Sequence, residues 1–148
     1  MNTAFKVELI DRILFSRWMR PPAKSDIEAM EEVMATAHKS LNGQLLIYVG
    51  SIGSHVKVPN AEERNNLTQL LKAARNHCEV AHVIIEGSEL QNSLQRVVIS
   101  GMLIITRTYD NYLSVHKNIE SAAADLTRRL HKDALPVIRA ARDRGLVT

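Results

Sequence analysis

The sequence predicts one α/β domain, a β-hairpin followed by alternating helices and strands that build a four- to five-stranded, mostly parallel sheet packed with helices. Apolar runs of strand length alternate with segments whose apolar residues recur at helical spacing. The chain has 148 residues, the length of one domain, and shows no repeat, low-complexity segment or linker. The expected order is β-β-α-β-α-β-α-β-α-α, which implies right-handed crossovers between parallel strands.

The hairpin is expected at the start of the chain. Residues 5–9 alternate apolar and charged side chains, the period of a half-buried strand, and a second extended run covers residues 13–18. The weak turn Asp11-Arg12 joins them, and one long bent strand is the alternative. Pro21 and Pro22 cannot continue a ladder, so the segment ends there.

The first helix has clear start and stop signals. Ser25 and Glu28 have the spacing of a capping box, and Asn42-Gly43 offers a left-handed stop. The apolar face between them consists of Ile27, Met30, Val33, Met34, Ala37 and Leu41.

Two strand–helix units follow. The apolar run 44–49 predicts a central strand, and the small residues of Gly50–Ser54 predict a flexible loop. Asn60, with Glu63 three residues later, begins the next helix, whose buried side is formed by Leu67, Leu70, Leu71 and Ala74. Residues 80–86 predict a strand buried on both faces, and Ser88 begins a helix that Gly101 either ends or allows to pack closely.

The last third predicts an edge strand and two helices. The strand covers residues 112–116, and Asn118 caps a helix whose inner face is Ile119, Ala122, Ala123, Leu126 and Leu130. A basic helix covers residues 133–145, with Pro136 in its first turn. Residues 1–148 thus form a single domain, with a core over about residues 5–130 and a C-terminal basic helix.

Composition indicates a soluble protein of the cytoplasm. Apolar residues make up 45% and charged residues 24% of the chain. Charges among the first twenty residues argue against a signal peptide, and no apolar run approaches the roughly 20 residues of a membrane span. The single cysteine, Cys78, excludes an internal disulfide and is expected to be a small buried residue.

The positive charge gathers near the end of the chain. The net charge is +3, and residues 128–144 hold six cations against two aspartates. A solvated face whose cations lie near helix C-termini is the favoured interpretation. Nucleic acid is not expected as a partner, because the basic segment contains no aromatic residues on which bases could stack.

Candidate binding residues lie where strands are expected to end. Ligands of open α/β sheets gather beyond the carboxyl ends of the strands. Two loops of small residues, Gly50–Ser54 and Glu86–Ser88, should meet there. Neither loop is a dinucleotide fingerprint or a P-loop, and glycines that simply let the chain turn are the alternative. The candidate ligand- or partner-binding residues are Ser51, Gly53, Ser54, Glu86, Gly87 and Ser88.

No motif predicts catalysis, a metal or a cofactor. The six histidines form no H-x-x-x-H or H-E-x-x-H pair, and G-x-S-x-G is absent. His82 lies inside an apolar strand and is expected to be a hydrogen-bonded core residue. We therefore expect a protein that is not an enzyme.

The element order, together with Val98-Ile-Ser-Gly-Met102 and the segment from Tyr112-Leu-Ser-Val-His116 to Leu126, resembles the STAS superfamily, the fold of anti-sigma-factor antagonists. The similarity covers about residues 5–130 and is closest to the STAS/SEC14-like branch of small bacterial proteins. Regulatory members of the superfamily carry a D-S-S-G-type motif whose serine is phosphorylated. The matching region here, Gly50–Ser54, lacks it.

The resemblance implies a non-enzymatic regulatory or scaffold module that acts by protein–protein interaction, with a partner protein or as a homodimer. The alternative is a protein that binds a small apolar or anionic ligand, using the loop 50–60 and the helix start at 86–91.

Overall fold

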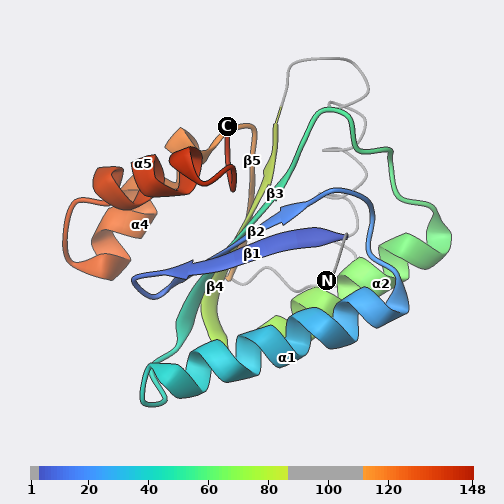
Figure 1. The fold of residues 1–148 in the computed structure, drawn as a ribbon, viewed down its shortest axis with the longest axis horizontal. Helices are drawn as coiled ribbons and strands as arrows, with labels where there is room; N and C mark the ends of the chain where they lie inside the picture. The colour runs from blue at the N-terminus through green and yellow to red at the C-terminus, as the bar shows by residue number, and fades with distance from the viewer. Residues whose placement is uncertain (1–3, 87–111) are drawn as a thin grey trace.

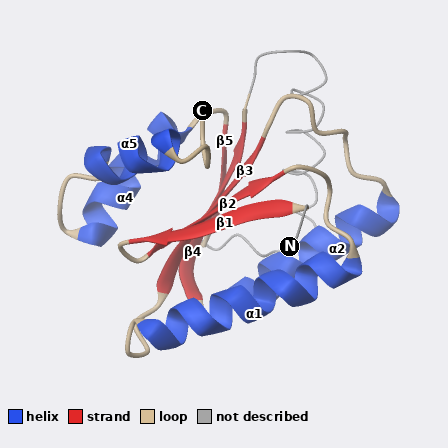
Figure 2. Cartoon of the chain, viewed as in Figure 1, coloured by secondary structure: helices blue, strands red, loops and turns tan. Residues whose placement is uncertain are grey.

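The computed structural model describes residues 4–86 and 112–148. It contains a five-stranded mixed sheet with helices on both faces (Figures 1 and 2). β1 pairs with β2 in antiparallel fashion, and every other neighbouring pair is parallel, which confirms the predicted class. The strands lie in chain order as β1 (Phe5–Ile10), β2 (Ile13–Trp18), β3 (Leu46–Ile52), β4 (Cys78–Ile85) and β5 (Leu113–His116).

The helices form two separate layers. α1 (Lys24–Ser40) and α2 (Ala61–Ala74) lie on one face of the sheet, while α4 (Ala123–Leu130) and α5 (Leu135–Asp143) lie on the other (Figure 1). A short 3-10 turn, η1 (Ile119–Ala122), precedes α4, and the Asn118 side chain accepts a hydrogen bond from Ser121 N–H at 3.1 Å. The helix predicted from Ser88 lies outside the described residues.

The hairpin is present, so the alternative of one bent strand is wrong. Ile10 lies opposite Ile13, and Asp11 between them adopts a left-handed φ of 55°. The Met19 N–H donates to Ala4 O at 2.8 Å, which places Ala4 in a hydrogen-bonded pair with Met19. Hydrogen-bonded pairs alternate in an antiparallel ladder, so the even-numbered residues of β1 bond to β2, and Phe5, Val7 and Leu9 direct their backbone groups to the outer edge.

The predicted capping box of the first helix is wrong by two residues. α1 begins at Lys24, and the Asp26 carboxylate accepts the backbone N–H of Ala23 at 2.8 Å. Asp26 therefore takes the part predicted for Glu28, and Ser25 lies inside the first turn. The predicted stop is confirmed, because Asn42 and Gly43 have φ values of 57° and 83°.

The predicted loop at residues 50–54 is wrong in its first half. Gly50, Ser51 and Ile52 continue β3 and pair with both β2 and β4. The glycine is explained by crowding, because a Cβ at Gly50 would lie 2.9 Å from the Tyr48 hydroxyl oxygen. That hydroxyl is buried and accepts a hydrogen bond from Trp18 Nε1 at 3.1 Å.

The second helix and the strand that follows it match the sequence closely. Asn60 accepts from Glu63 N–H at 2.8 Å, and the Glu63 carboxylate accepts from Asn60 N–H at 3.0 Å, so the capping box is confirmed. The next strand begins two residues early, at Cys78, and ends one residue early, at Ile85. Cys78 is buried as predicted, and burial raises the pKa of its thiol to about 12.

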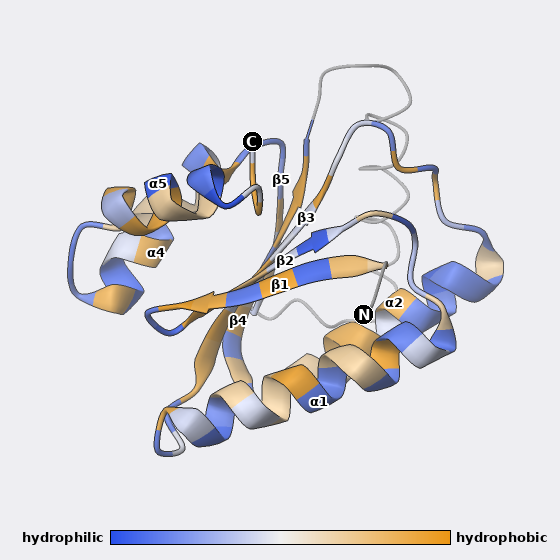
Figure 3. Ribbon diagram, viewed as in Figure 1, coloured by the Kyte–Doolittle hydropathy of each residue, from blue (hydrophilic) through white to orange (hydrophobic). Residues whose placement is uncertain are grey.

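Each face of the sheet has its own apolar core. β1, at the edge of the sheet, alternates hydrophobic and hydrophilic residues along its length (Figure 3). The face beneath α1 and α2 carries side chains such as Leu14 and Tyr48, and the opposite face carries Phe15 and Val49. The second core also contains Val137, Ile138, Ala141, Leu146 and Val147, so it extends well past the predicted boundary near residue 130.

Candidate functional site

Three polar side chains meet at the carboxyl ends of the parallel strands. Arg17 lies near the end of β2, Ser51 near the end of β3, and Glu86 directly after β4, all on the α5 face of the sheet. The Arg17 guanidinium donates to the Ser51 hydroxyl at 3.2 Å and forms an ion pair with the Glu86 carboxylate. The side chains of Arg17 and Glu86 are only 12% and 7% exposed, so this ion pair is largely shielded from water.

Residues 146–148 lie across these strand ends. The Ser51 hydroxyl donates to Leu146 O at 2.6 Å. The Thr148 backbone N–H and hydroxyl both donate to the second carboxylate oxygen of Glu86, at 2.7 Å and 2.5 Å. Leu146 and Val147 are buried, so the segment covers the cluster with apolar side chains while its polar groups bond to the sheet.

Sequence analysis found part of this cluster. Of the predicted residues, Ser51 and Glu86 are in it, and Gly53 adjoins it, since a Cβ there would lie 2.8 Å from Arg17 Nη2. Ser54 is exposed, whereas Gly87 and Ser88 lie outside the described residues. Arg17 and Thr148 were missed, because no local pattern links positions 17, 86 and 148.

A second polar network crosses the α4 face near β5. His82, buried on β4, bonds through Nε2 to Asp125 Oδ2 at 2.8 Å and through Nδ1 to His116 Nε2 at 2.8 Å. An ionised carboxylate only accepts, so the His82 proton lies on Nε2, and His116 donates to His82 Nδ1. The prediction that His82 is a hydrogen-bonded core residue is confirmed.

The network continues through α4 to the hairpin turn. Arg129 Nε donates to Asp125 at 2.8 Å, and Arg129 Nη1 donates to Glu79 at 2.8 Å. Glu79 also pairs with Arg12, whose Nη2 donates to the Arg129 backbone oxygen at 2.7 Å. The chain of contacts thus joins the β1–β2 turn to β5.

Burial and charge set the protonation states in this network. Desolvation lowers the pKa of His82 despite the Asp125 carboxylate, and desolvation together with His82 lowers the pKa of His116 to about 4. Desolvation alone would raise the pKa of Asp125, but hydrogen bonds from Arg129, His82 and Arg128 outweigh it and lower that pKa to about 2. At neutral pH the two imidazoles are therefore uncharged and Asp125 is ionised.

A small apolar cavity opens beside the loop after β3. Its empty volume is about 340 Å³, part of it open to solvent, and it is lined by residues that include Trp18, Pro21, Ile52, Val56 and Leu67. A second, inner cavity shares Trp18, Ile52 and Leu67 and reaches Tyr48.

An apolar groove runs along the outer strand of the sheet. It lies between β1 and α1, and among the described strands nothing pairs with the outer edge of β1. Its apolar lining is formed by Val7, Leu9, Leu14, Ala29, Val33 and Ala37.

The basic segment near the end of the chain is largely neutralised. Of its six cations, five contact a carboxylate among the described residues, and Arg144 for example pairs with Glu8 on β1. These contacts favour the interpretation of a solvated helix face.

The described part of the chain contains neither a cluster of metal-ligating side chains nor a helix that could span a membrane. Across residues 4–86 and 112–148, no group of three or more His, Cys, Asp or Glu side chains is placed to share a metal ion. None of the helices in these ranges is both long and apolar enough to span a bilayer. No family model, curated protein or solved structure matches the chain.

Proposed function

We propose that the protein is a non-enzymatic interaction module that forms a homodimer by pairing β1 with β1 of a second copy. The observation that carries this proposal is the outer edge of β1, where the sequence Phe5-Lys-Val-Glu-Leu9 is complementary to itself about a two-fold axis through Val7. Open strand edges are templates for pairing with another strand.

The backbone supports this register. Phe5, Val7 and Leu9 direct their N–H and C=O groups outward, because the even-numbered residues bond to β2. With Val7 opposite Val7 of the second copy, Phe5 lies opposite Leu9. Each of these pairs can exchange two hydrogen bonds, which gives about six across the interface.

The side chains support the same register. Lys6 lies opposite Glu8 of the second copy, twice, at positions where antiparallel side chains come closest. On the other face of the strand, Val7 and Leu9 belong to the apolar groove beside α1, so the two grooves become neighbours in the dimer. A register shifted by two residues would place like charges opposite each other. A register shifted by one residue would place apolar side chains opposite charged ones.

Charge reversal tests the dimer. Lys6→Glu and Glu8→Lys should each weaken association by about tenfold to a hundredfold, because each creates two like-charge contacts across the axis. An equimolar mixture of the two variants should recover the dimer, since both glutamates of the first variant would then face the two lysines of the second. Sedimentation velocity measures both results.

The matched control is the double variant Lys6→Glu/Glu8→Lys, which keeps the complementarity and should dimerise like the natural sequence. The Glu8–Arg144 pair is solvent-exposed and should contribute little to folding, so loss of the dimer would not reflect unfolding. A mixture of the single variants that stays monomeric would rule this register out.

We propose in addition that the fold is STAS-like. The support is the initial hairpin, the alternation that follows, and the segment 112–126, which contains β5, η1 and the start of α4. In this proposal the module acts as a regulator or scaffold, and its contacts with other proteins carry the function.

A second candidate function is binding of a small apolar ligand in the cavity beside residues 52–59. The observation that favours it is the lining, which is almost entirely apolar and includes Trp18, the only tryptophan of the chain. The enclosed part of the cavity is only about 30 Å³, so it suits a methyl-sized group or the edge of a ring.

Trp18 fluorescence tests this candidate directly. Bromobenzene should quench the fluorescence saturably, because a bromine atom in the cavity would lie against the indole ring. Val56→Phe, which fills the cavity, should weaken the quenching at least tenfold, whereas Leu45→Phe, at an exposed position, should leave it unchanged. Linear, unsaturable quenching in all three proteins would exclude the site.

A further inference from the structure

Residues 146–148 contact the sheet as a bound peptide would. Two hydrogen bonds join them to α5, from Leu146 N–H to Ala141 O and from Arg142 Nε to Thr148 O. Three others join them to the sheet, two through their backbone, at Leu146 O and Thr148 N–H, and one through the Thr148 hydroxyl. All three partners are side-chain atoms at strand ends, on Ser51 and Glu86. The segment itself belongs to no helix or strand.

We infer that the ends of β2, β3 and β4 form a binding site for an extended peptide segment of another protein, and that the chain's own residues 146–148 occupy this site. The ligand would carry two apolar residues and then threonine or serine, because both Leu146 and Val147 are buried in this site. Ser51 would donate to the backbone carbonyl of its first residue, and Glu86 would accept the backbone N–H and hydroxyl of its third. The site is separate from the β1 edge.

Contacts among Arg17, Ser51 and Glu86 hold the sheet side of the site in place. Arg17 donates to both Ser51 and Glu86, so it fixes the two recognition groups relative to each other. A buried ion pair of this kind adds little net stability compared with apolar residues of similar size. The position of the Arg17–Glu86 ion pair at the strand ends therefore favours a role in recognising the peptide.

The occupant follows the glycine that ends α5. α5 ends at Asp143, and Gly145 has a φ of 73°, a backbone conformation that glycine adopts without strain. Leu146 N–H bonds back to Ala141 O, and residues 146–148 then enter the site. Burial of Leu146 and Val147 keeps the site occupied most of the time, so a competing peptide binds with an affinity reduced by the small open fraction.

Peptide titration tests the inference on the full chain. A fluorescein-labelled Gly-Leu-Val-Thr amide should bind the natural protein weakly and the Leu146→Ala variant at least tenfold more tightly, as measured by fluorescence anisotropy. Adding Glu86→Gln to that variant should weaken binding at least tenfold. Arg139→Ala, at an exposed position of α5, should match the natural protein.

A folded Leu146→Ala variant that does not bind the peptide would overturn the inference. Because Leu146 is fully buried, Thr148→Val provides a milder second variant that removes only the hydroxyl contact, and it should bind the peptide about threefold to tenfold more tightly. Native-state hydrogen exchange gives an independent result. The Thr148 amide should exchange by local opening, independently of denaturant, whereas exchange only through global unfolding would show that the segment does not release.

Discussion

Replacing Arg17 with methionine is expected to lower the free energy of unfolding by about 3–5 kcal/mol, the usual cost of leaving one member of a buried ion pair without its partner. The Glu86 carboxylate would remain in a position where its side chain is only 7% exposed. Ser51 would lose the guanidinium donor as well. Urea denaturation followed by circular dichroism measures the change.

Two comparisons make this prediction specific. Adding Glu86→Leu to Arg17→Met should recover a large part of the loss, because no uncompensated charge then remains buried. Arg142→Met removes the arginine of an exposed pair with Glu120 and should cost less than about 1 kcal/mol. Equal effects of Arg17→Met and Arg142→Met would show that the strand-end ion pair is not buried in solution.

Acidification from pH 7 to pH 5 is expected to lower the free energy of unfolding by about 1–2 kcal/mol through His116, after allowance for its partial exposure. Its pKa rises from about 4 in the folded protein to the usual 6.5 on unfolding, so the unfolded chain binds more protons across this range. Stability is therefore highest above pH 6.5 and falls as the pH drops toward 4.

Other groups add to the same trend. The lowered pKa values of His82 and His77 act in the same direction as that of His116. Asp125, with a pKa of about 2, stabilises the fold above its unfolded value of 3.8, and this contribution is lost as the pH falls from there toward 2.

The variant His116→Gln should flatten the pH dependence between 7 and 5, although His82 and His77 leave a residual slope. His55→Gln, at an exposed position, is the matched control and should leave the slope unchanged. Thermal unfolding followed across the pH series measures both. An unchanged slope in His116→Gln would show that the imidazole pair is not desolvated in solution.

Local signals predicted most of the secondary structure. Asn60 and Glu63 identify the start of α2 because a capping box needs only residues three apart, and the apolar face of α1 follows from helical spacing alone. The hairpin was predicted from the alternation of apolar and charged residues. These features depend on near neighbours, which a single sequence displays.

Features that depend on distant contacts were predicted poorly. Gly50 and Ser51 resemble loop residues, yet they lie in β3, since Tyr48 crowds the glycine and Leu146 and Arg17 satisfy the serine. Likewise the link between His82 and Asp125 spans 43 positions and leaves no local trace. The candidate site could be placed at the strand ends, but its arginine could not be found.

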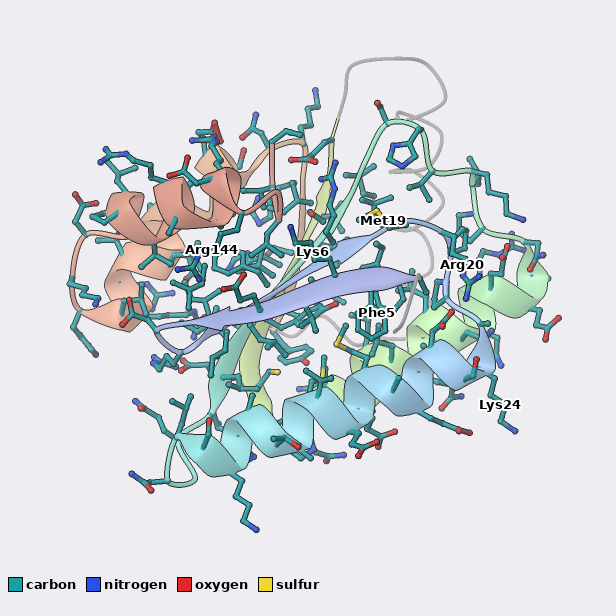
Figure 4. The ribbon with its side chains drawn as sticks, in the orientation of Figure 1. Phe5, Lys6, Met19, Arg20, Lys24 and Arg144 are labelled. Atoms are coloured by element: carbon teal, nitrogen blue, oxygen red, sulfur yellow. The ribbon has the colours of Figure 1, made fainter. Side chains whose placement is uncertain are left out.

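Contacts of Lys6 and Glu8 with Arg144 link the β1 edge to the peptide site at the strand ends. Lys6 donates to the backbone oxygen of Arg144, the residue directly before Gly145 (Figure 4). Glu8 pairs with the Arg144 side chain. A second β1 strand that draws Lys6 and Glu8 toward itself would loosen this anchor. Thermodynamic reciprocity then requires that peptide capture at the strand ends and pairing at the sheet edge change each other's affinity by the same factor. Peptide titration of the natural protein at chain concentrations below and above its dimer dissociation constant measures that factor.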